Sequence, residues 1–455
     1  MDFLAVLNEI DNFIWGPPLL VLLVGTPPLL VLLVGTGILL TIRLHLLQIF
    51  KLPKALSLIF RAQNAGSGDI DSFKALCTAL SATVGTGNIV GVATAIHAGG
   101  PGALFWMWMA AFFGMATKYA EGLLAVKYRE TDEKGEIAGG PMYYIKNGMG
   151  EKYKWLGGLF AFFGVLVAYF GIGTFAQVNS IVDITKMTIG LDPVWTGAIL
   201  TIFVAAITIG GLQSIATAAS RIVPAMAFIY FLSTIGVLLV FADKVPAAVS
   251  MIFESAFTTT AATGGFLGAT VMMAMRNGVA RGVFSKAAAA KTKWPAEQGL
   301  ISMTGTFIDT IIICTLTGLT LVVTGVWCGM ENGAALTNAA FTSAFPVFGG
   351  YMLLIGLVLF AFTTILGWNY YGERCMIYLV GTKGVLPYRL VFILLIASGA
   401  FLKLEAIWIL ADIVNGLMAI PNLIALLFLS GICVRETKKY MDHLKTGKPY
   451  EEYED

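Results

Sequence analysis

Three glycines interrupt a long apolar stretch where a membrane helix should be most regular. Residues 81–91 read SATVGTGNIVG and lie inside an apolar run that extends from about residue 72 to 98. Gly85, Gly87 and Gly91 each cost on the order of 1 kcal/mol of helix stability relative to Ala. We therefore expect the helix to unwind there.

An unwound turn in hydrocarbon must find partners for its backbone groups, so it persists only where it is buried or lines a cavity. The two half-helix ends offer N–H donors to an anion and carbonyls to a cation, with Thr83, Thr86 and Asn88 as side-chain ligands. This combination suits a zwitterion together with a small hard cation. The alternative is that the small residues only allow close packing of helices.

The composition is that of a polytopic membrane protein. Of 455 residues, 57% are hydrophobic and only 12% are charged, whereas soluble proteins carry about 25% charge. The formal net charge of +2 is too small to indicate a nucleic-acid partner. Five cysteines without metal-ligand spacing and three scattered histidines support neither a disulfide framework nor a zinc or histidine-based catalytic site. The long apolar N-terminal segment, without Lys or Arg before Arg43, is not predicted to be a cleavable signal peptide.

The apolar pattern predicts an all-α protein with about eleven transmembrane helices, at roughly 20 residues per crossing. The expected spans are 15–42, 72–98, 101–126, 156–182, 194–212, 222–242, 251–275, 298–326, 347–372, 386–402 and 407–431. Within the first span, residues 17–26 recur unchanged as 27–36. We interpret this as a local duplication outside the functional core.

The basic residues test this topology. With these spans, 25 of the 29 Lys and Arg residues fall on one side of the membrane. Cytoplasmic loops hold most Lys and Arg. We therefore expect the protein in the cell membrane with its N-terminus outside and its C-terminus in the cytoplasm.

Setting the first span aside leaves ten, and two groups of five enter the membrane in opposite orientations. Inverted repeats of this kind bind substrate between the halves, on helices broken at matching positions. The first span of the second half is again rich in glycine near its middle, at Gly264, Gly265 and Gly268. The predicted units are an extra helix with its cytoplasmic connection (1–71), a first repeat (72–243), a second repeat (244–434) and a cytoplasmic tail (435–455).

Four stretches resemble one known family. They read GGPGALFWMWMAAFFG at 99–114, GGPMYYI at 139–145, RGVFS at 281–285 and TTILGWNYYGER at 363–374. These closely resemble signatures of the alanine or glycine:cation symporters, also called sodium:alanine symporters, in the expected order from about residue 70 to 375. The resemblance implies the fold of the leucine transporter, a 5+5 inverted repeat, and import of small neutral amino acids with Na+ as the coupling ion.

The chain departs from that family pattern after Ser285. An Asn-Glu-Ala-Gly stretch is expected there, whereas this chain has Lys286, four alanines and Lys291. About ten residues are missing on the cytoplasmic side, which bears on inner-gate closure and transport rate more than on the substrate.

The substrate is expected at the two breaks. Backbone N–H groups at a half-helix start suit the carboxylate, and the carbonyls of the second break suit the ammonium. The fold implied by the resemblance places further residues beside the site, and bulky rings there favour alanine or glycine. The predicted substrate residues are Thr86, Gly87, Asn88, Phe175, Gln177, Gly264, Gly265, Phe266 and Trp368. For the aromatic rings and Gln177, ordinary packing is the alternative.

The resemblance implies that Na+ is held between the first core helix and the eighth. The implied ligands are the carbonyls of Ser81, Val84 and Phe360 and the hydroxyls of Thr363 and Thr364. Without the resemblance, adjacent Thr residues in a span are unremarkable, because Thr often bonds back to its own helix.

Carboxylates inside membrane spans are costly and usually functional. Asp309 lies near the middle of 298–326, and Glu121 follows Lys118 by three residues, the spacing of a helical ion pair. A proton-coupled symporter would use Asp309, although the preferred interpretation of this residue is a neutral or hydrogen-bonded acid between helices. Two other functions lack support in the sequence. An intramembrane enzyme would need a nucleophile with a base or a metal cluster, which the few scattered histidines do not support. A channel would need a ring of charged residues or a repeated filter motif, and the sequence shows neither. The prediction is therefore a cation-coupled symporter that works by alternating access, with no enzymatic activity.

Overall fold

The computed structural model describes residues 3–15, 28–59, 72–131, 137–171, 173–257, 292–401 and 405–450. The predicted second break, with Gly264, Gly265 and Phe266, lies outside the described residues. So do the segment after Ser285 and the first copy of the tandem duplication.

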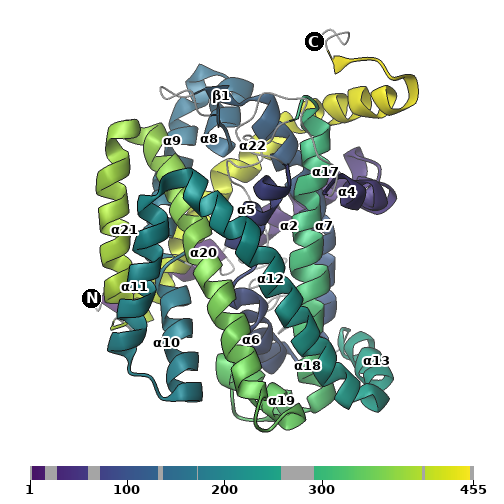
Figure 1. Ribbon diagram of the computed structural model, residues 1–455. Helices are drawn as coiled ribbons and strands as arrows, with labels where there is room; N and C mark the ends of the chain where they lie inside the picture. The colour runs from purple at the N-terminus through teal and green to yellow at the C-terminus, as the bar shows by residue number, and fades with distance from the viewer. Residues whose placement is uncertain are drawn as a thin grey trace.

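The described chain is a bundle of helices (Figure 1). Its helices are α1 (Phe3–Trp15), α2 (Pro28–Arg43), α3 (Leu47–Phe50), α4 (Leu52–Ile59), α5 (Ser72–Thr83), α6 (Val90–Gly99), α7 (Ala103–Lys127), α8 (Pro141–Tyr144), α9 (Lys154–Phe170), α10 (Phe175–Ile189), α11 (Pro193–Ile209), α12 (Gly211–Val240), α13 (Val245–Ser255), α17 (Pro295–Thr306), α18 (Thr315–Thr324), α19 (Gly333–Ala344), α20 (Gly349–Val380), α21 (Val385–Gly399) and α22 (Glu405–Thr446). Shorter helical turns are η2 (Thr86–Asn88), η3 (Ile145–Met149), η4 (Glu151–Tyr153), η5 (Ala242–Lys244), η7 (Phe307–Cys314), η8 (Val326–Cys328) and η9 (Thr382–Gly384). Strands β1 (Glu130–Thr131) and β2 (Ile137–Ala138) pair antiparallel, with Glu130 opposite Ala138.

Six helices in the described part of the chain are long and apolar enough to cross a membrane, and one bent pair adds a seventh span. Helix α11 and the end of α2 are apolar but shorter. The chain therefore has the architecture of a multi-pass membrane protein. The total of eleven spans stays a prediction.

The glycine-rich break is present where the sequence predicted it. Helix α5 ends at Thr83, η2 forms one turn at Thr86–Asn88, and α6 begins at Val90. The two halves are bent by 66°. Gly91, however, lies inside α6 rather than in the break, because a glycine in the first turn of a helix forfeits few intrahelical bonds.

A second interruption was not predicted. The expected span 156–182 is divided, since α9 ends at Phe170 and α10 begins at Phe175. A third irregularity lies between α17 and α18, where η7 is a π-helix that contains Asp309. Wider π turns often occur at functional sites.

Helices α7 and α17 pack along one another at close range. A Cβ at Gly122 of α7 would lie 2.4 Å from the hydroxyl of Ser302, and one at Gly299 of α17 would lie 2.7 Å from the carbonyl oxygen of Tyr119. The glycines thus let the two backbones approach, as small residues do between membrane helices. This contact holds η7, which continues α17, beside the break between α5 and α6.

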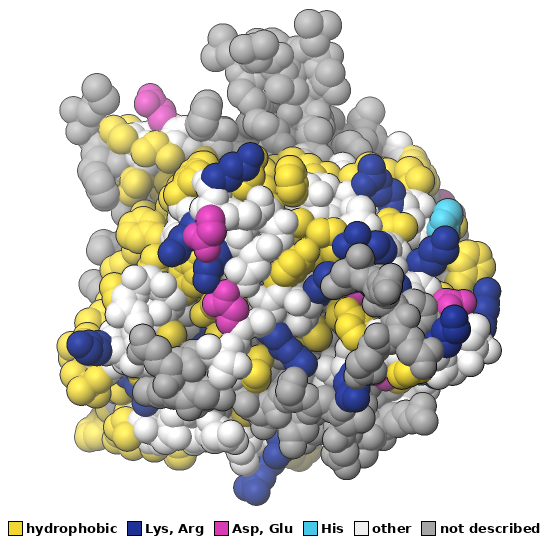
Figure 2. Space-filling view, turned by 90° about the horizontal axis from the view of Figure 1, so that it is seen from above, with side chains coloured by type: hydrophobic (Ala, Val, Ile, Leu, Met, Phe, Trp, Pro, Cys, Tyr) yellow, Lys and Arg dark blue, Asp and Glu magenta, His cyan; other side chains and the backbone are white. Residues whose placement is uncertain are grey.

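One end of the molecule is rich in basic side chains. Figure 2 shows the end at which β1 and the C-terminus lie in Figure 1, and Lys and Arg side chains gather on it. A gathering of Lys and Arg is what the positive-inside rule describes for a cytoplasmic face.

Candidate functional site

Asn88 fixes the shape of the break. Its side-chain oxygen accepts a hydrogen bond from the backbone N–H of Gly85 at 3.0 Å. Its Nδ2 donates to the Oδ1 and the backbone carbonyl of Asp309 in η7, at 2.6 and 3.1 Å. Asn88 is buried. The side-chain amide of Asn88 thus accepts one backbone N–H of the unwound turn and connects the turn with a neighbouring helix.

Asp309 is therefore a hydrogen-bonded acid between helices. Besides Asn88, its carboxylate accepts a bond from the hydroxyl of Thr310 at 3.1 Å. It lies beside the break, because η7 packs against η2.

Gln177 reaches the break from the second interruption. Its Oε1 accepts the backbone N–H of Thr86 at 3.3 Å, and the side chain is fully buried in the first turn of α10. Because α10 begins only at Phe175, the interruption brings this turn against η2. The structure thus places predicted residues from two distant segments, Thr86 and Gln177, in direct contact.

Two predicted aromatic residues, Trp368 of α20 and Phe175 of α10, lie at this same interruption. A Cβ at Gly173 would lie 2.5 Å from the Cβ of Trp368, so the α9–α10 connection packs directly on the tryptophan. Phe175 stacks on Phe170 with ring centroids 6.5 Å apart and an angle of 4° between the planes. Both predicted aromatic residues are buried.

The predicted sodium oxygens converge on one threonine. The hydroxyl of Thr364 in α20 lies 2.8 Å from the carbonyl oxygen of Phe360 and 3.2 Å from that of Val84, at the end of α5. All three residues are buried. Hard cations prefer oxygen ligands of this kind, so the chemistry of the donors suits Na+.

The remaining predicted sodium residues lie nearby but differ in their contacts. The hydroxyl of Thr363 donates to the carbonyls of Leu359 and Phe360 at 3.0 and 3.1 Å. At Ser81 the predicted ligand is the carbonyl, which stays a prediction, and the hydroxyl donates to the carbonyl of Thr78 at 2.8 Å. These two hydroxyls thus bond back to their own helices.

Gly85 provides the space for this arrangement. Its backbone is extended (φ −145°, ψ −161°), a conformation that any residue adopts, so its role is steric. A Cβ there would lie 2.4 Å from the Thr364 hydroxyl oxygen. Only glycine lets the break approach α20 closely enough for Val84 and Thr364 to share one site.

Comparison with known proteins identifies the family. A model described as the sodium:alanine symporter family matches residues 2–454. The chain belongs to this family. An uncharacterized transporter of Haemophilus influenzae is 54% identical over 457 residues, which cover 98% of each chain. The sodium/alanine symporter AgcS of Methanococcus maripaludis is 49% identical over 458 residues, 97% of this chain and 98% of the relative.

A solved structure shows the same fold. The crystal structure of MhsT in complex with L-phenylalanine matches with a TM-score of 0.54 at 12% identity, over 83% of this chain and 99% of the other. At this identity the likeness concerns the fold alone. Membership of the family identifies a multi-pass membrane symporter rather than an intramembrane enzyme.

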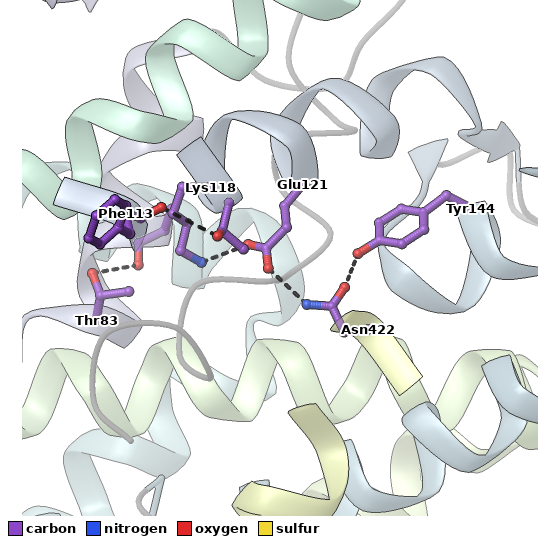
Figure 3. A network of polar contacts seen from close by, with 8 residues as sticks. Thr83, Phe113, Lys118, Glu121, Tyr144 and Asn422 are labelled. Carbon is purple, nitrogen blue, oxygen red and sulfur yellow. Dashed lines mark hydrogen bonds and ion pairs between the residues drawn. The ribbon is translucent and has the colours of Figure 1, made fainter. Parts of the chain in front are cut away.

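A buried polar network, only partly predicted, lies between α7, α22 and α8 (Figure 3). Lys118 and Glu121 form the predicted ion pair, 3.0 Å apart and less than 8% exposed. The other oxygen of Glu121 accepts a bond from the Nδ2 of Asn422 at 2.8 Å, and Asn422 in turn accepts the hydroxyl of Tyr144. Helix α7, which bears this pair, also packs against η7, the π-helix that contains Asp309. The network therefore extends from the neighbourhood of the break to α22.

No local pattern in the sequence could have revealed Asn422 and Tyr144, because they meet Glu121 only through the fold. The interruption before Phe175 did carry a signal. Gly171, Gly173 and Thr174 form a short stretch of glycine and threonine, like the stretch at the first break.

We predict that Gly85→Ala abolishes the stabilisation of the protein by Na+. The added methyl group must displace Thr364 or open the break, which separates the oxygens that would hold the ion. A ligand that binds only the folded state raises the melting temperature. The measurement is the difference in melting temperature of the purified protein in Na+ and in K+.

The matched control for this substitution is Gly158→Ala in α9, where a Cβ meets nothing within 4 Å. The control should keep the wild-type response to Na+. A wild-type response in Gly85→Ala would show that the close approach of Val84 and Thr364 is not needed for the ion.

We predict that Glu121→Gln lowers the free energy of unfolding by about 3–5 kcal/mol, the cost of leaving one charge of a buried pair without its partner. The double variant Lys118→Met/Glu121→Gln should recover a large part of this loss, since it removes both charges. Thermal unfolding in detergent measures both effects. Glu254→Gln, an exposed change in α13, is the control. Equal stability of the single and double variants would contradict the ion-pair interpretation.

Proposed function

We propose that the chain is a secondary active transporter that imports small neutral amino acids, alanine or glycine, together with Na+. The observation that carries the proposal is the convergence of the Val84 and Phe360 carbonyls on the Thr364 hydroxyl, across a helix broken at membrane depth. The name of the family and the name of the relative AgcS both contain sodium and alanine, which supports the same function.

The proposed Na+ site comprises the carbonyls of Ser81, Val84 and Phe360 and the hydroxyls of Thr363 and Thr364. Each oxygen that now bonds within the protein would turn to the ion. Na+ would then hold α5 against α20 and stabilise the unwound turn. The amino acid would meet a preformed site, and its apparent affinity rises with the fraction of protein in the competent state.

The proposed substrate site lies on the other side of the same turn. The carboxylate of the amino acid would accept hydrogen bonds from the N–H groups of Thr86, Gly87 and Asn88. It would replace Gln177, which now accepts the N–H of Thr86. Phe175 and Trp368 would limit the side chain to that of alanine or glycine. Gly264, Gly265 and Phe266 belong to the proposal from the sequence alone.

Transport would follow from the two repeats, 72–243 and 244–434, preceded by the extra helix in 1–71 and followed by the tail 435–455. The broken helices would rock against the surrounding scaffold and expose the site to each side in turn. The basic face in Figure 2 supports a cytoplasmic position for the tail. The outside position of the N-terminus belongs to the proposal from the sequence alone.

The contacts of Asp309 and the names of the relatives favour coupling to Na+ over a proton-driven mechanism through Asp309. Its carboxylate is bound to Asn88 and Thr310, and so serves to hold the break. The names of the family and of AgcS give sodium as the ion.

We predict that purified protein in proteoliposomes accumulates labelled alanine when an inward Na+ gradient is imposed, and not when K+ replaces Na+ at the same pH. Thr364→Val should raise the half-saturating Na+ concentration about tenfold or more, a loss of roughly 1.4 kcal/mol, because one hydroxyl ligand is gone.

The control variant is Thr324→Val, whose hydroxyl bonds within its own helix, α18, to the carbonyls of Thr320 and Leu321. It should transport with wild-type Na+ dependence. Accumulation driven by an inward proton gradient without Na+ would contradict sodium coupling. It would instead support a proton-coupled symporter that uses Asp309.

A further inference from the structure

A cavity of about 490 Å³ lies between α10, α11 and α20, away from the candidate site. In Figure 1 these three helices stand side by side, and they contact one another. The cavity is lined by side chains of all three helices, among them Thr185, Ile189, Ile199, Leu200, Phe203 and Phe362.

The cavity is elongated along the helices. On α10 the lining residues Ile181, Thr185 and Ile189 recur every four positions, which places them on one face. Eight residues of helix rise about 12 Å, and the lining of α20 from Leu354 to Phe362 has the same extent. The space therefore suits a long, narrow occupant that runs along the bundle.

The lining offers no polar group to a ligand. Its two hydroxyls bond to their own helices, Thr185 to the carbonyl of Ile181 at 2.6 Å and Thr196 to that of Asp192 at 3.3 Å. Water needs several polar partners to occupy a cavity, and an amino acid needs partners for both of its charges. The occupant must be apolar.

The mouth of the cavity faces the bilayer. The lining residues Ile189, Ile199, Phe203 and Ile355 are 47% to 60% exposed on the outside of the bundle, where a multi-pass membrane protein meets lipid. Trp195, 64% exposed at the start of α11, is the kind of residue that marks the level of the membrane interface. Exposed Lys186 lies at the same end, next to Thr185 in the sequence.

We propose that the cavity binds one acyl chain of a membrane phospholipid, whose head group lies at the level of Lys186 and Trp195. The occupant is long, apolar and supplied by the bilayer onto which the cavity opens. It lies against the face of α20 opposite to Phe360 and Thr364, since these residues are about half a turn from the lining positions. The lipid thus packs against α20 on the face opposite to the proposed sodium ligands.

The test is the number of phospholipids that the purified protein retains, counted by native mass spectrometry after mild delipidation and readdition of phosphatidylethanolamine and phosphatidylglycerol. Leu200→Trp fills the cavity, and Ile199→Trp blocks its mouth. Each variant should retain one phospholipid fewer than the wild type. Phe228→Trp, a lipid-facing change on α12 with the position 63% exposed, should retain the wild-type number.

A second measurement keeps the proposal testable if Leu200→Trp fails to fold. Readdition of the same lipids should raise the melting temperature of the delipidated wild type more than that of Ile199→Trp, whose substitution lies on the exposed rim. Equal lipid counts and equal shifts in Ile199→Trp and the control would overturn the proposal. So would a change from dimer to monomer with no loss of lipid, which would make a second copy of the chain the occupant.

Discussion

The structure depends on one constraint, that every backbone group of a helix broken inside a membrane must find a partner within the protein. The break between α5 and α6 meets this requirement through one residue of its own and residues from two other parts of the chain. Asn88 takes the N–H of Gly85, Gln177 takes that of Thr86, and Thr364 donates to the carbonyl of Val84. These bonds hold the unwound turn, and under the proposed mechanism the amino acid would replace the Gln177 bond and Na+ the Thr364 bond. The site and the fold are thus stabilised by the same atoms.

The same logic applies to charge. A carboxylate far from water needs a fixed counterpart, and Lys118 provides it for Glu121. Asn422 and Tyr144 extend the pair to α22 and α8. Because α7 also packs against η7, whose Asp309 accepts a bond from Asn88, the network connects the break with helices that bear none of the proposed ligands. It is a physical connection between the site and the rest of the bundle.

Much of this arrangement could be predicted from the sequence, for identifiable reasons. Gly85 and Gly87 mark the break because glycine weakens a helix locally, and the spacing of Lys118 and Glu121 places them on one helix face. The sodium residues followed only from the resemblance to a family, since Thr363 and Thr364 are ordinary by themselves. The interruption before Phe175 was missed because Gly171 and Gly173 lie in an apolar run that fits a continuous helix. The π-helix around Asp309 and the partnership of Asn422 with Glu121 arise from packing between distant segments, which no local pattern encodes. The matching break in the second half and the count of eleven spans stay predictions.

The central claim is that Na+ completes a broken helix and so creates the amino-acid site. Equilibrium binding of labelled alanine to the purified protein, in Na+ and then in K+ at matched ionic strength and pH, tests this most directly. The account predicts saturable binding in Na+ that falls at least tenfold in K+, a difference of about 1.4 kcal/mol or more. Equal affinity in the two salts would contradict it, because the break would then form the site without the ion.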